Sequence, residues 1–212
     1  MPDWQAEAII LSVRPHGEGS AVISVLTADY GRHAGLVRGG ASSKMRGIIQ
    51  PGNRVRVIWR ARLSEQLGQM QIELVQSVPA LLMDSPLRLS GVASMCALLD
   101  GALPEREAQP GLFEGSAALL DVIVLDDDNA GWVEGYVRWE LGLLAAVGYR
   151  LDLARCIASG QTSDLAFVSP KSGGAVARHQ AGSFASRMLA LPMFLGGISC
   201  GKHDWIAGLD LT

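Results

Sequence analysis

The feature that most constrains the fold of this chain is a change of sequence pattern near Pro79. Before it, short segments rich in β-branched residues alternate with clusters of Gly, Pro and Asn, and no segment has the length and period of a helix. After it, longer segments with helix-type starts and stops follow one another. We therefore expect an α+β protein, with a β domain over residues 1–80 and a mainly helical domain over residues 81–212.

Five candidate strands precede Pro79 and are separated by turn-forming residues. They span residues 4–13, 21–27, 33–37, 54–62 and 69–75. In the fourth strand, RVRVIWRAR, valines alternate with arginines, so the pattern places Trp59 on the core side and Arg54 and Arg56 on the other face. Five short strands favour a small closed barrel. A basic loop between the third and fourth strands is typical of the OB-fold, which commonly binds oligonucleotides.

Three helices are expected after Pro79. Ser85-Pro86 is a cap and first-turn pair that opens a helix ending near Leu103. The other two span residues 113–125 and 132–147, and the last is apolar on most sides, which places it at the buried centre of the helical domain. The acidic run at residues 126–129 lacks the spacing of an EF-hand, so we interpret it as a solvated loop rather than a cation site.

The composition describes a chain with a real core. Hydrophobic residues make up 49% of the 212 residues and charged residues 18%, which excludes wholesale disorder. Cys96, Cys156 and Cys200 are odd in number and far apart, which favours a reducing cytoplasm over a disulfide framework. No signal peptide pattern opens the sequence, and the longest uncharged run is too short and too interrupted to span a bilayer. We expect a cytoplasmic protein without a membrane partner.

Charge is distributed unevenly along the chain. Residues 1–80 contain nine Lys or Arg and six Asp or Glu, whereas residues 81–212 contain nine and fifteen. Between Arg32 and Arg62 there are eight basic residues and no acidic one. Because solvated faces usually mix both signs, this segment predicts an anionic partner. The candidate nucleic-acid-binding residues are Arg32, Arg38, Lys44, Arg46, Arg54, Arg56, Arg60 and Arg62.

The alternative interpretation of these residues is a solvated strand face. The loop GGASSKMRG at residues 39–47 argues against it, because its small residues permit close approach of a phosphate while Lys44 and Arg46 supply charge. Aromatic residues are few in this half, so binding is expected to rest on phosphate contacts, with a strong salt dependence. Replacing Arg54 and Arg56 by alanine is then expected to weaken binding to single-stranded DNA without unfolding the barrel.

Residues 149–180 predict a small knuckle made of short extended pieces and a Gly-Gly turn. Zinc knuckles of this shape bind the metal with four close ligands. Here Ser159 stands where a second thiolate would follow Cys156, and His179 is the only other plausible ligand nearby. Two soft ligands do not close a tetrahedral site, so we predict a knuckle without zinc, held by packing, and expect no metal or cofactor.

Two short glycine motifs overlap at residues 196–203. The G-x-x-x-x-G-K motif has His203 where a P-loop needs Ser or Thr, and G-x-S-x-G is followed by too few residues to complete a triad. We interpret both as a loop. His16 and His33 lie in or beside turns without a nucleophile or base as partner, so both are expected at the surface. The sequence therefore predicts a protein that is not an enzyme.

Several ordered pieces of the sequence resemble the RecO family of bacterial recombination mediators. They are AIILSVRPHGEGSAVISVLTADYGRHAGLVRGG and IIQPGNRV in the first half, and WELGLLAAVGYRLDLARC with the glycines at 173–174 in the second. Together they cover most of residues 4–178. Some RecO-like proteins carry a four-cysteine zinc site in the knuckle, and this sequence departs from them by keeping only Cys156. The helical part of the family also usually continues beyond the length found here.

The resemblance implies a DNA repair and homologous recombination mediator of the RecFOR pathway, located in the cytoplasm with the nucleoid. It implies binding to single- and double-stranded DNA, strand annealing, binding to RecR, and help for RecA in displacing single-strand-binding protein. It also implies a groove in the helical half for the acidic C-terminal tail of that protein, for which Arg138, Arg150 and Arg155 are candidates. The alternative is a protein-interaction scaffold without enzyme activity, in which the OB barrel is purely structural.

Overall fold

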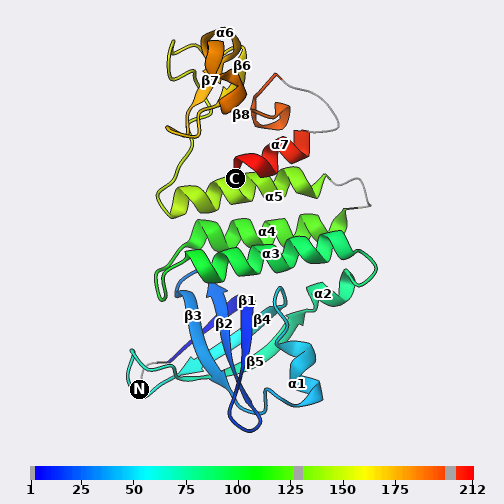
Figure 1. Cartoon of the computed structure of the whole chain (residues 1–212). Coiled ribbons are helices and arrows are strands. Elements are labelled where there is room, and N and C mark those ends of the chain that lie inside the picture. Colours follow the sequence, from blue (N-terminus) through cyan, green and yellow to red (C-terminus); the bar gives the residue numbers. More distant parts are fainter. Residues whose placement is uncertain (1–2, 127–130, 199–203) are drawn as a thin grey trace. The chain divides into compact units, whose positions relative to one another are not determined.

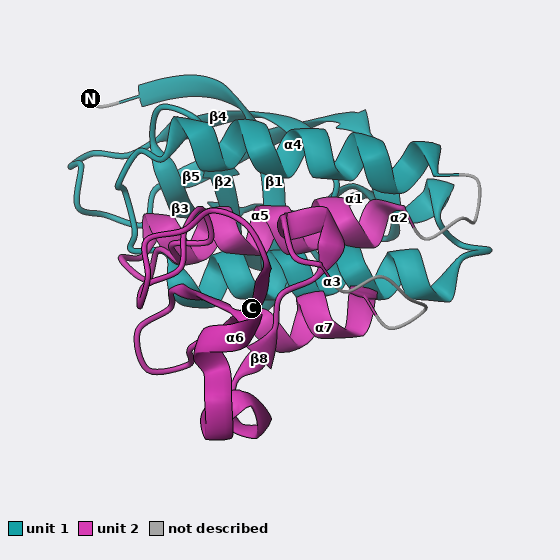
Figure 2. Ribbon diagram, turned by 90° about the horizontal axis from the view of Figure 1, so that it is seen from above, with its two compact units in different colours: residues 1–126 teal, residues 127–212 magenta. Residues whose placement is uncertain are grey.

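A computed structural model of the chain describes residues 3–126, 131–198 and 204–212 (Figure 1). Packing of the backbone divides the chain into two compact units, residues 1–126 and 127–212, which Figure 2 colours separately. The first unit contains a β-barrel and the helices that follow it, and the second contains a helix and a small sheet. These units are defined by contacts within the folded chain, whereas the boundary near residue 80 was inferred from a change of sequence pattern. That boundary therefore stays a prediction.

The barrel contains five strands. They are β1 (Asp3–His16), β2 (Ser20–Thr27), β3 (Gly31–Val37), β4 (Arg54–Arg60) and β5 (Gln69–Gln76). Their order around the closed barrel is β1-β2-β3-β5-β4, with β1 antiparallel to both β2 and β4 and with β3 parallel to β5. This order is that of an OB-fold. The predicted five-stranded barrel and the α+β class are therefore confirmed.

One long strand closes the barrel by pairing on both sides. Residues 3–9 of β1 pair with β4, and residues 9–16 pair with β2, with a register shift between Ile10 and Ser12. In β4 the valines and Trp59 point inward, and Trp59 is only 2% exposed, as the alternation predicts. The barrel core is formed mainly by Ala8, Ile10, Ala21, Ile23, Val25, Val37, Val55, Val57, Trp59 and Met70.

The connection between β3 and β4 contains a short helix, α1 (Ser43–Ile48), where the sequence pattern predicted only a loop. The Ser42 hydroxyl accepts the Met45 N–H at 3.3 Å and caps the first turn. At the other end, the Asn53 side chain donates to the Ile48 carbonyl at 2.8 Å. These local hydrogen bonds give a glycine-rich segment a fixed turn of helix, which carries Lys44 and Arg46 on an exposed surface.

Three further helices complete the first unit: α2 (Val78–Leu81), α3 (Pro86–Ala102) and α4 (Pro110–Leu125). Helix α3 begins at Pro86 and ends before Leu103, as predicted, and α4 begins at Pro110, three residues before its predicted start. Figure 1 shows α3 and α4 lying across one end of the barrel. Helix α3 packs on β1, where the Cys96 thiol donates to the Ile10 carbonyl at 3.5 Å.

The second unit combines α5 (Trp132–Ala146) and α7 (Asp204–Leu211) with a three-stranded sheet. The sheet has the order β7-β6-β8, formed by β6 (Leu165–Val168), β7 (Ala175–Ala177) and β8 (Leu189–Ala190). The short helix α6 (Arg178–Ala181) and two 3₁₀ helices, Gly182–Arg187 and Met193–Leu195, connect these pieces. The predicted third helix and the predicted strand at 165–168 are both present.

The predicted knuckle corresponds to the turns and the sheet around Cys156. Cys156 is buried, and its sulfur accepts the Ala177 N–H at 3.3 Å. Burial opposes ionisation of this thiol, but hydrogen bonds from the Ser159 hydroxyl and from nearby backbone N–H groups outweigh it and lower the pKa to about 7. His179 is exposed and lies 3.7 Å from Asp164. Within the described ranges, no group of three or more His, Cys, Asp or Glu side chains could hold a metal ion.

Two sequence interpretations fall outside the described residues in whole or in part. They concern the acidic run at 126–129, of which only Asp126 is described, and the glycine motifs at 196–203, which are described as far as residue 198. In the described part of the chain, no helix combines the length and the hydropathy that crossing a lipid bilayer requires.

Candidate nucleic-acid interface

The eight predicted basic residues fall into two groups, according to whether a carboxylate of the first unit lies opposite them. Arg32, Arg54 and Arg56 have such a partner. The other five are Arg38, Lys44, Arg46, Arg60 and Arg62. All five are exposed, and no carboxylate of the described residues lies within the 4 Å that would make an ion pair with them.

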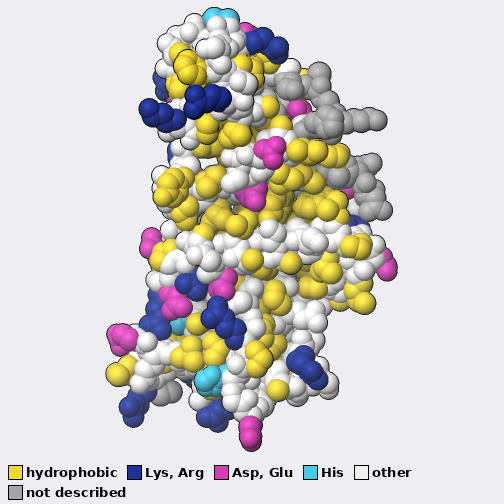
Figure 3. Space-filling model, in the orientation of Figure 1, with side chains coloured by type: hydrophobic (Ala, Val, Ile, Leu, Met, Phe, Trp, Pro, Cys, Tyr) yellow, Lys and Arg dark blue, Asp and Glu magenta, His cyan; other side chains and the backbone are white. Residues whose placement is uncertain are grey.

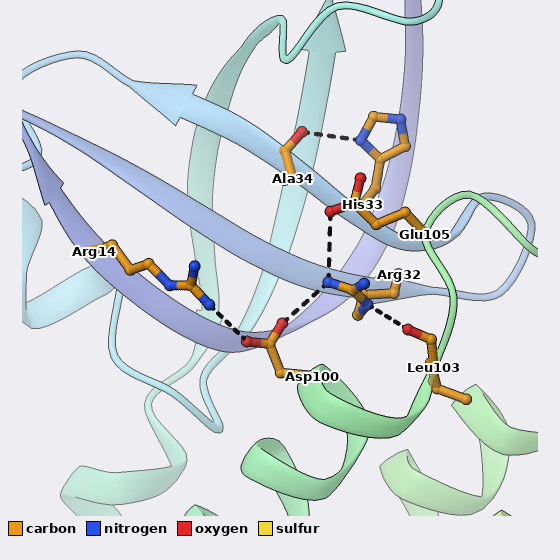
Figure 4. Close-up of polar contacts among 7 residues, drawn as sticks. All are labelled: Arg14, Arg32, His33, Ala34, Asp100, Leu103 and Glu105. Carbon is orange, nitrogen blue, oxygen red and sulfur yellow. Dashed lines mark hydrogen bonds and ion pairs between the residues drawn. The ribbon is translucent and has the colours of Figure 1, made fainter.

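Arg32 is bound to the end of α3 (Figure 4). Its Nε donates to the Leu103 carbonyl at 2.8 Å, and its Nη1 lies 3.5 Å from Asp100 and 3.6 Å from Glu105. Only 18% of the Arg32 side chain is exposed, and Asp100 is also within 3.7 Å of Arg14. Because its donors are directed at these acceptors, Arg32 attaches β3 to α3 and presents little charge to an outside ligand.

Arg54 and Arg56 are paired in different ways. Arg54 Nη2 lies 2.9 Å from the Asp121 carboxylate and also donates to the Ala117 carbonyl, so it joins β4 to α4. Arg56 lies 3.3 Å from Glu73 on the neighbouring strand, with both side chains well exposed. An exposed pair of this kind contributes little free energy, so Arg56 is held far less firmly than Arg54.

Arg38, Arg60 and Arg62 line one groove at the edge of the barrel, with a volume of about 940 Å³. We call it the barrel groove. It lies between the end of β3 and the loop of residues 61–68 that joins β4 to β5. The barrel is closed least tightly here, because β3 and β5 share a single register pair, between Leu36 and Gln69. The groove is also lined by Met45, Ile58, Gln66, Leu67, Gln69, Gln71 and Ile72.

The lining of the barrel groove combines three kinds of chemistry. The guanidinium groups can bind phosphate oxygens with several donors each. The glutamine amides can donate to and accept from the edges of bases, and the apolar side chains can contact base faces. The site therefore suits a polyanion with flat apolar parts, and its position beside the β4–β5 loop is the one at which OB-folds commonly bind oligonucleotides.

The two remaining basic residues lie on α1. Arg46 lines a second hollow of about 550 Å³ with Pro15, Ala21, Ile49 and other small or apolar residues, whereas Lys44 is exposed on the helix surface. Figure 3 shows the Lys and Arg side chains of the barrel as separate dark blue groups on the face in view, rather than as one continuous patch. The structure thus gathers three of the eight residues in one groove and places the other five elsewhere on the unit.

The surface position expected for His33 from its place beside a turn is wrong. It is 4% exposed and lies on the inner face of β3, with its ring edge-on to Trp4 and Trp59 at 5.2 and 4.8 Å. Burial lowers the pKa of His33 below its ordinary value, although its hydrogen bond to Ala34 acts in the other direction. Trp4 also stacks on Tyr30 at 4.5 Å, so the rings of Trp4, Tyr30, His33 and Trp59 form one cluster that the sequence analysis did not predict. Every second residue of β3 is buried, and His33 lies in the same alternating row as Gly35 and Val37. That alternation was the sequence signal for a buried His33.

Two family models match most of the chain, and several DNA repair proteins resemble it over nearly its full length. The family described as "Recombination protein O N terminal" matches residues 1–78, and "Recombination protein O C terminal" matches residues 83–208. DNA repair protein RecO of Jannaschia sp. is 47% identical over 210 residues, which make up 99% of this chain and 84% of that protein. Those of Rhodospirillum centenum and Cereibacter sphaeroides are 48% and 49% identical, over 99% and 100% of this chain and 84% and 87% of theirs.

The chain belongs to the RecO family of DNA repair proteins. Membership confirms the resemblance seen in the sequence.

The basic candidates in the second unit of this RecO chain differ in their surroundings. Arg138 lies 3.5 Å from Glu134, donates to the Phe194 carbonyl at 2.9 Å and stands over the Phe194 ring. Arg155 lies 3.8 Å from Asp152. Arg150 is exposed and lines a hollow of about 450 Å³ at the end of α5. The other lining residues are Leu141, Gly142, Ala145, Ala146, Leu151 and Leu153. Of the three candidates, only Arg150 therefore combines a hollow with a guanidinium that no carboxylate in the described ranges pairs with.

Proposed function

We propose that this RecO family member is a mediator of DNA repair and homologous recombination, without enzyme activity, that binds single- and double-stranded DNA in the barrel groove. The observation that carries the proposal is the convergence of Arg38, Arg60 and Arg62 on one groove of about 940 Å³, with no intramolecular carboxylate partner among the described residues. Arginines left unpaired beside an OB-fold loop are the expected electrostatic footprint of a nucleic-acid site.

Binding at this groove would rest on phosphate contacts. Each neutralised phosphate releases condensed counterions, so affinity should fall steeply as salt is added. The apolar and amide lining can hold bases without reading their sequence, which fits a protein that acts on any broken chromosome. Neutralising the phosphates of two strands also lowers their mutual repulsion, and this is the physical basis for the strand annealing that we propose.

The test is fluorescence anisotropy with a labelled oligonucleotide at several salt concentrations. The variant Arg38→Ala/Arg60→Ala/Arg62→Ala should bind at least about tenfold more weakly at low salt, and the slope of log affinity against log salt should fall by about 2 in magnitude for single strands. The matched control is Arg14→Ala/Arg178→Ala/Arg187→Ala, which removes three exposed arginines elsewhere. Equal behaviour of the two triple variants would favour the alternative, a protein-interaction scaffold with a structural barrel.

The hollow beside Arg150 supports a second part of the proposed function. We assign it to the acidic C-terminal tail of single-strand-binding protein, because it offers an apolar surface for a hydrophobic side chain and one cation for a carboxylate. Through this contact, together with RecR, the protein would help RecA replace single-strand-binding protein on DNA in the cytoplasm. Arg150→Glu should abolish binding of a peptide with the tail sequence, whereas Arg155→Glu should retain it. The reverse result would exclude this hollow.

A further inference from the structure

The connection between α3 and α4 runs along the edge of the barrel. We call residues 103–109 the strap. Arg106 N–H donates to the Arg32 carbonyl at 2.8 Å, and Glu105 forms a parallel β-bridge with Arg32. From the other side, the Arg32 guanidinium donates to the Leu103 carbonyl (Figure 4). Backbone and side-chain hydrogen bonds therefore attach the strap to β3 at Arg32.

The strap also lies tightly against Gly31, the first residue of β3. A Cβ atom added to Gly31 would lie 1.9 Å from the Glu107 carbonyl oxygen, a distance that no real contact allows. Gly31 also has φ of +61°, which side-chain-bearing residues rarely adopt. The strap and β3 therefore approach so closely that only glycine fits at position 31.

Arg106 reaches from the strap to the loop of residues 61–68. Its Nη1 donates to the Ser64 carbonyl at 2.5 Å and its Nη2 to the Gln66 carbonyl at 3.0 Å, so one planar guanidinium bridges two loop carbonyls. Arg106 has φ of +64°, a strained conformation for a residue other than glycine. In this conformation the side chain forms both hydrogen bonds to the loop.

The same loop is anchored on its inner side by Trp59. The indole N–H of the buried Trp59 donates to the Leu67 carbonyl at 2.9 Å, and Gly68 packs directly on this ring. Gln66, whose carbonyl Arg106 binds, lines the barrel groove together with Leu67 and Arg62. The loop that supplies part of the groove wall is thus held by Trp59 from within and by Arg106 from the strap.

We infer that Arg106 is a positioning residue for nucleic-acid binding: it fixes the loop of residues 61–68 so that Arg62 faces the barrel groove. This inference rests on the function proposed for that groove. A loop ordered before binding loses less conformational entropy when the ligand arrives, so Arg106 raises affinity without touching DNA. The alternative is that Arg106 itself binds a phosphate, and the two roles make different predictions.

The first measurement needs no DNA. Arg106→Asn tolerates the left-handed backbone but removes the guanidinium, and Arg106→Lys keeps the charge without the planar fork. Hydrogen exchange of the Gln66 amide and of the Trp59 indole N–H should accelerate by about tenfold or more in both variants, as expected when local protection is lost. Amides of the β1–β2 ladder are the internal control and should stay unchanged. Wild-type exchange in both variants would overturn the positioning role, whether or not the groove binds DNA.

The second measurement is a double-mutant cycle with Arg62. Arg106→Asn and Arg106→Lys should each reduce affinity for a labelled single-stranded oligonucleotide by about threefold, and the loss should nearly vanish in an Arg62→Ala background. A phosphate-binding Arg106 predicts instead that Arg106→Lys keeps wild-type affinity and that the losses combine independently. Either of these results would overturn the inference. The proposed function itself is tested separately, by the variant Arg38→Ala/Arg60→Ala/Arg62→Ala, in which Arg106 is intact.

Discussion

Two sides of one barrel use the same residue type for opposite purposes. Toward the helices, Arg32 and Arg54 meet carboxylates of α3 and α4 and hold the unit together. At the groove edge, Arg38, Arg60 and Arg62 have the same charge but no carboxylate partner within the described residues. The comparison teaches that the basic residues of one sequence segment can have different roles. What lies opposite each guanidinium decides whether its donors are occupied within the protein or left open to the ligand that we propose.

The sharpest way to break this comparison is to remove an arginine from the helix side. Arg32→Ala should lower the free energy of unfolding by about 2–4 kcal/mol, because the Leu103 carbonyl loses its donor and the largely buried Asp100 keeps only its longer, exposed ion pair with Arg14 among the described residues. Chemical denaturation measures the loss. Arg60→Ala, on the groove side, is the control and should stay within about 0.5 kcal/mol of wild type. A stable Arg32→Ala protein with weakened DNA binding would place Arg32 among the binding residues after all.

The second test is the affinity of single variants for DNA. Arg60→Ala should weaken binding to a single-stranded oligonucleotide by about 3–10-fold at low salt and reduce the salt slope by about 0.7, the effect of one lost phosphate contact. Arg54→Ala should leave both values unchanged at temperatures where it remains folded, because Asp121 and the Ala117 carbonyl already bind its Nη2 and only 23% of its side chain is exposed. Equal losses from the two variants in anisotropy titrations would show that pairing does not separate the groups.

Acidification affects the core of the barrel rather than either group of arginines. Burial lowers the pKa of His33, so the folded protein disfavours its charged form. Stability from this residue is fully present above the unfolded pKa of 6.5 and decreases as the pH falls from 6.5 toward the lowered folded value. Denaturation midpoints at several pH values should show this decline in wild type and in His16→Gln. If His33→Phe declines over that range as steeply as wild type, His33 is not the cause.

The smallest effect is expected where the two groups of arginines meet. Glu73→Gln removes the exposed partner of Arg56 and should raise DNA affinity by less than about twofold, with a stability change below about 0.5 kcal/mol. Glu114→Gln, which removes an exposed carboxylate on α4, is the matched control for the change in net charge. An increase in affinity shared by both variants would indicate long-range charge rather than release of Arg56.

Local patterns predicted the framework of the fold but not the partners of its side chains. Alternation in β4 placed Trp59 in the core correctly, and Ser85-Pro86 located the start of α3. The helix α1 was missed because its cap, Ser42, lies in a segment whose glycines suggest a loop. His33 was misplaced because its neighbour in sequence is a turn, whereas its burial depends on Trp4 and Trp59 from other strands.

The sequence predicted which segment contains the candidate site but not which of its residues share one surface. All three groove arginines lie in the stretch that the charge pattern selected. Asp100 and Asp121, which neutralise Arg32 and Arg54, come from helices far along the chain, and no local pattern shows which carboxylate will face which strand. Arg106 lies outside the basic segment, in an acidic stretch after the predicted first helix, and its side chain binds carbonyl groups rather than charges, so no sequence pattern points to it.

The single pair between Leu36 and Gln69 has a mechanical consequence. Every other strand junction of the barrel is held by several consecutive register pairs, so the β3–β5 contact is where the closed sheet resists separation least. The hydrogen bond from the Leu36 N–H to the Gly68 carbonyl, 3.1 Å long, is therefore expected to open first. Parting the strands there widens the barrel groove itself. A small hinge-like opening at this junction would change the width of the groove without unfolding any strand.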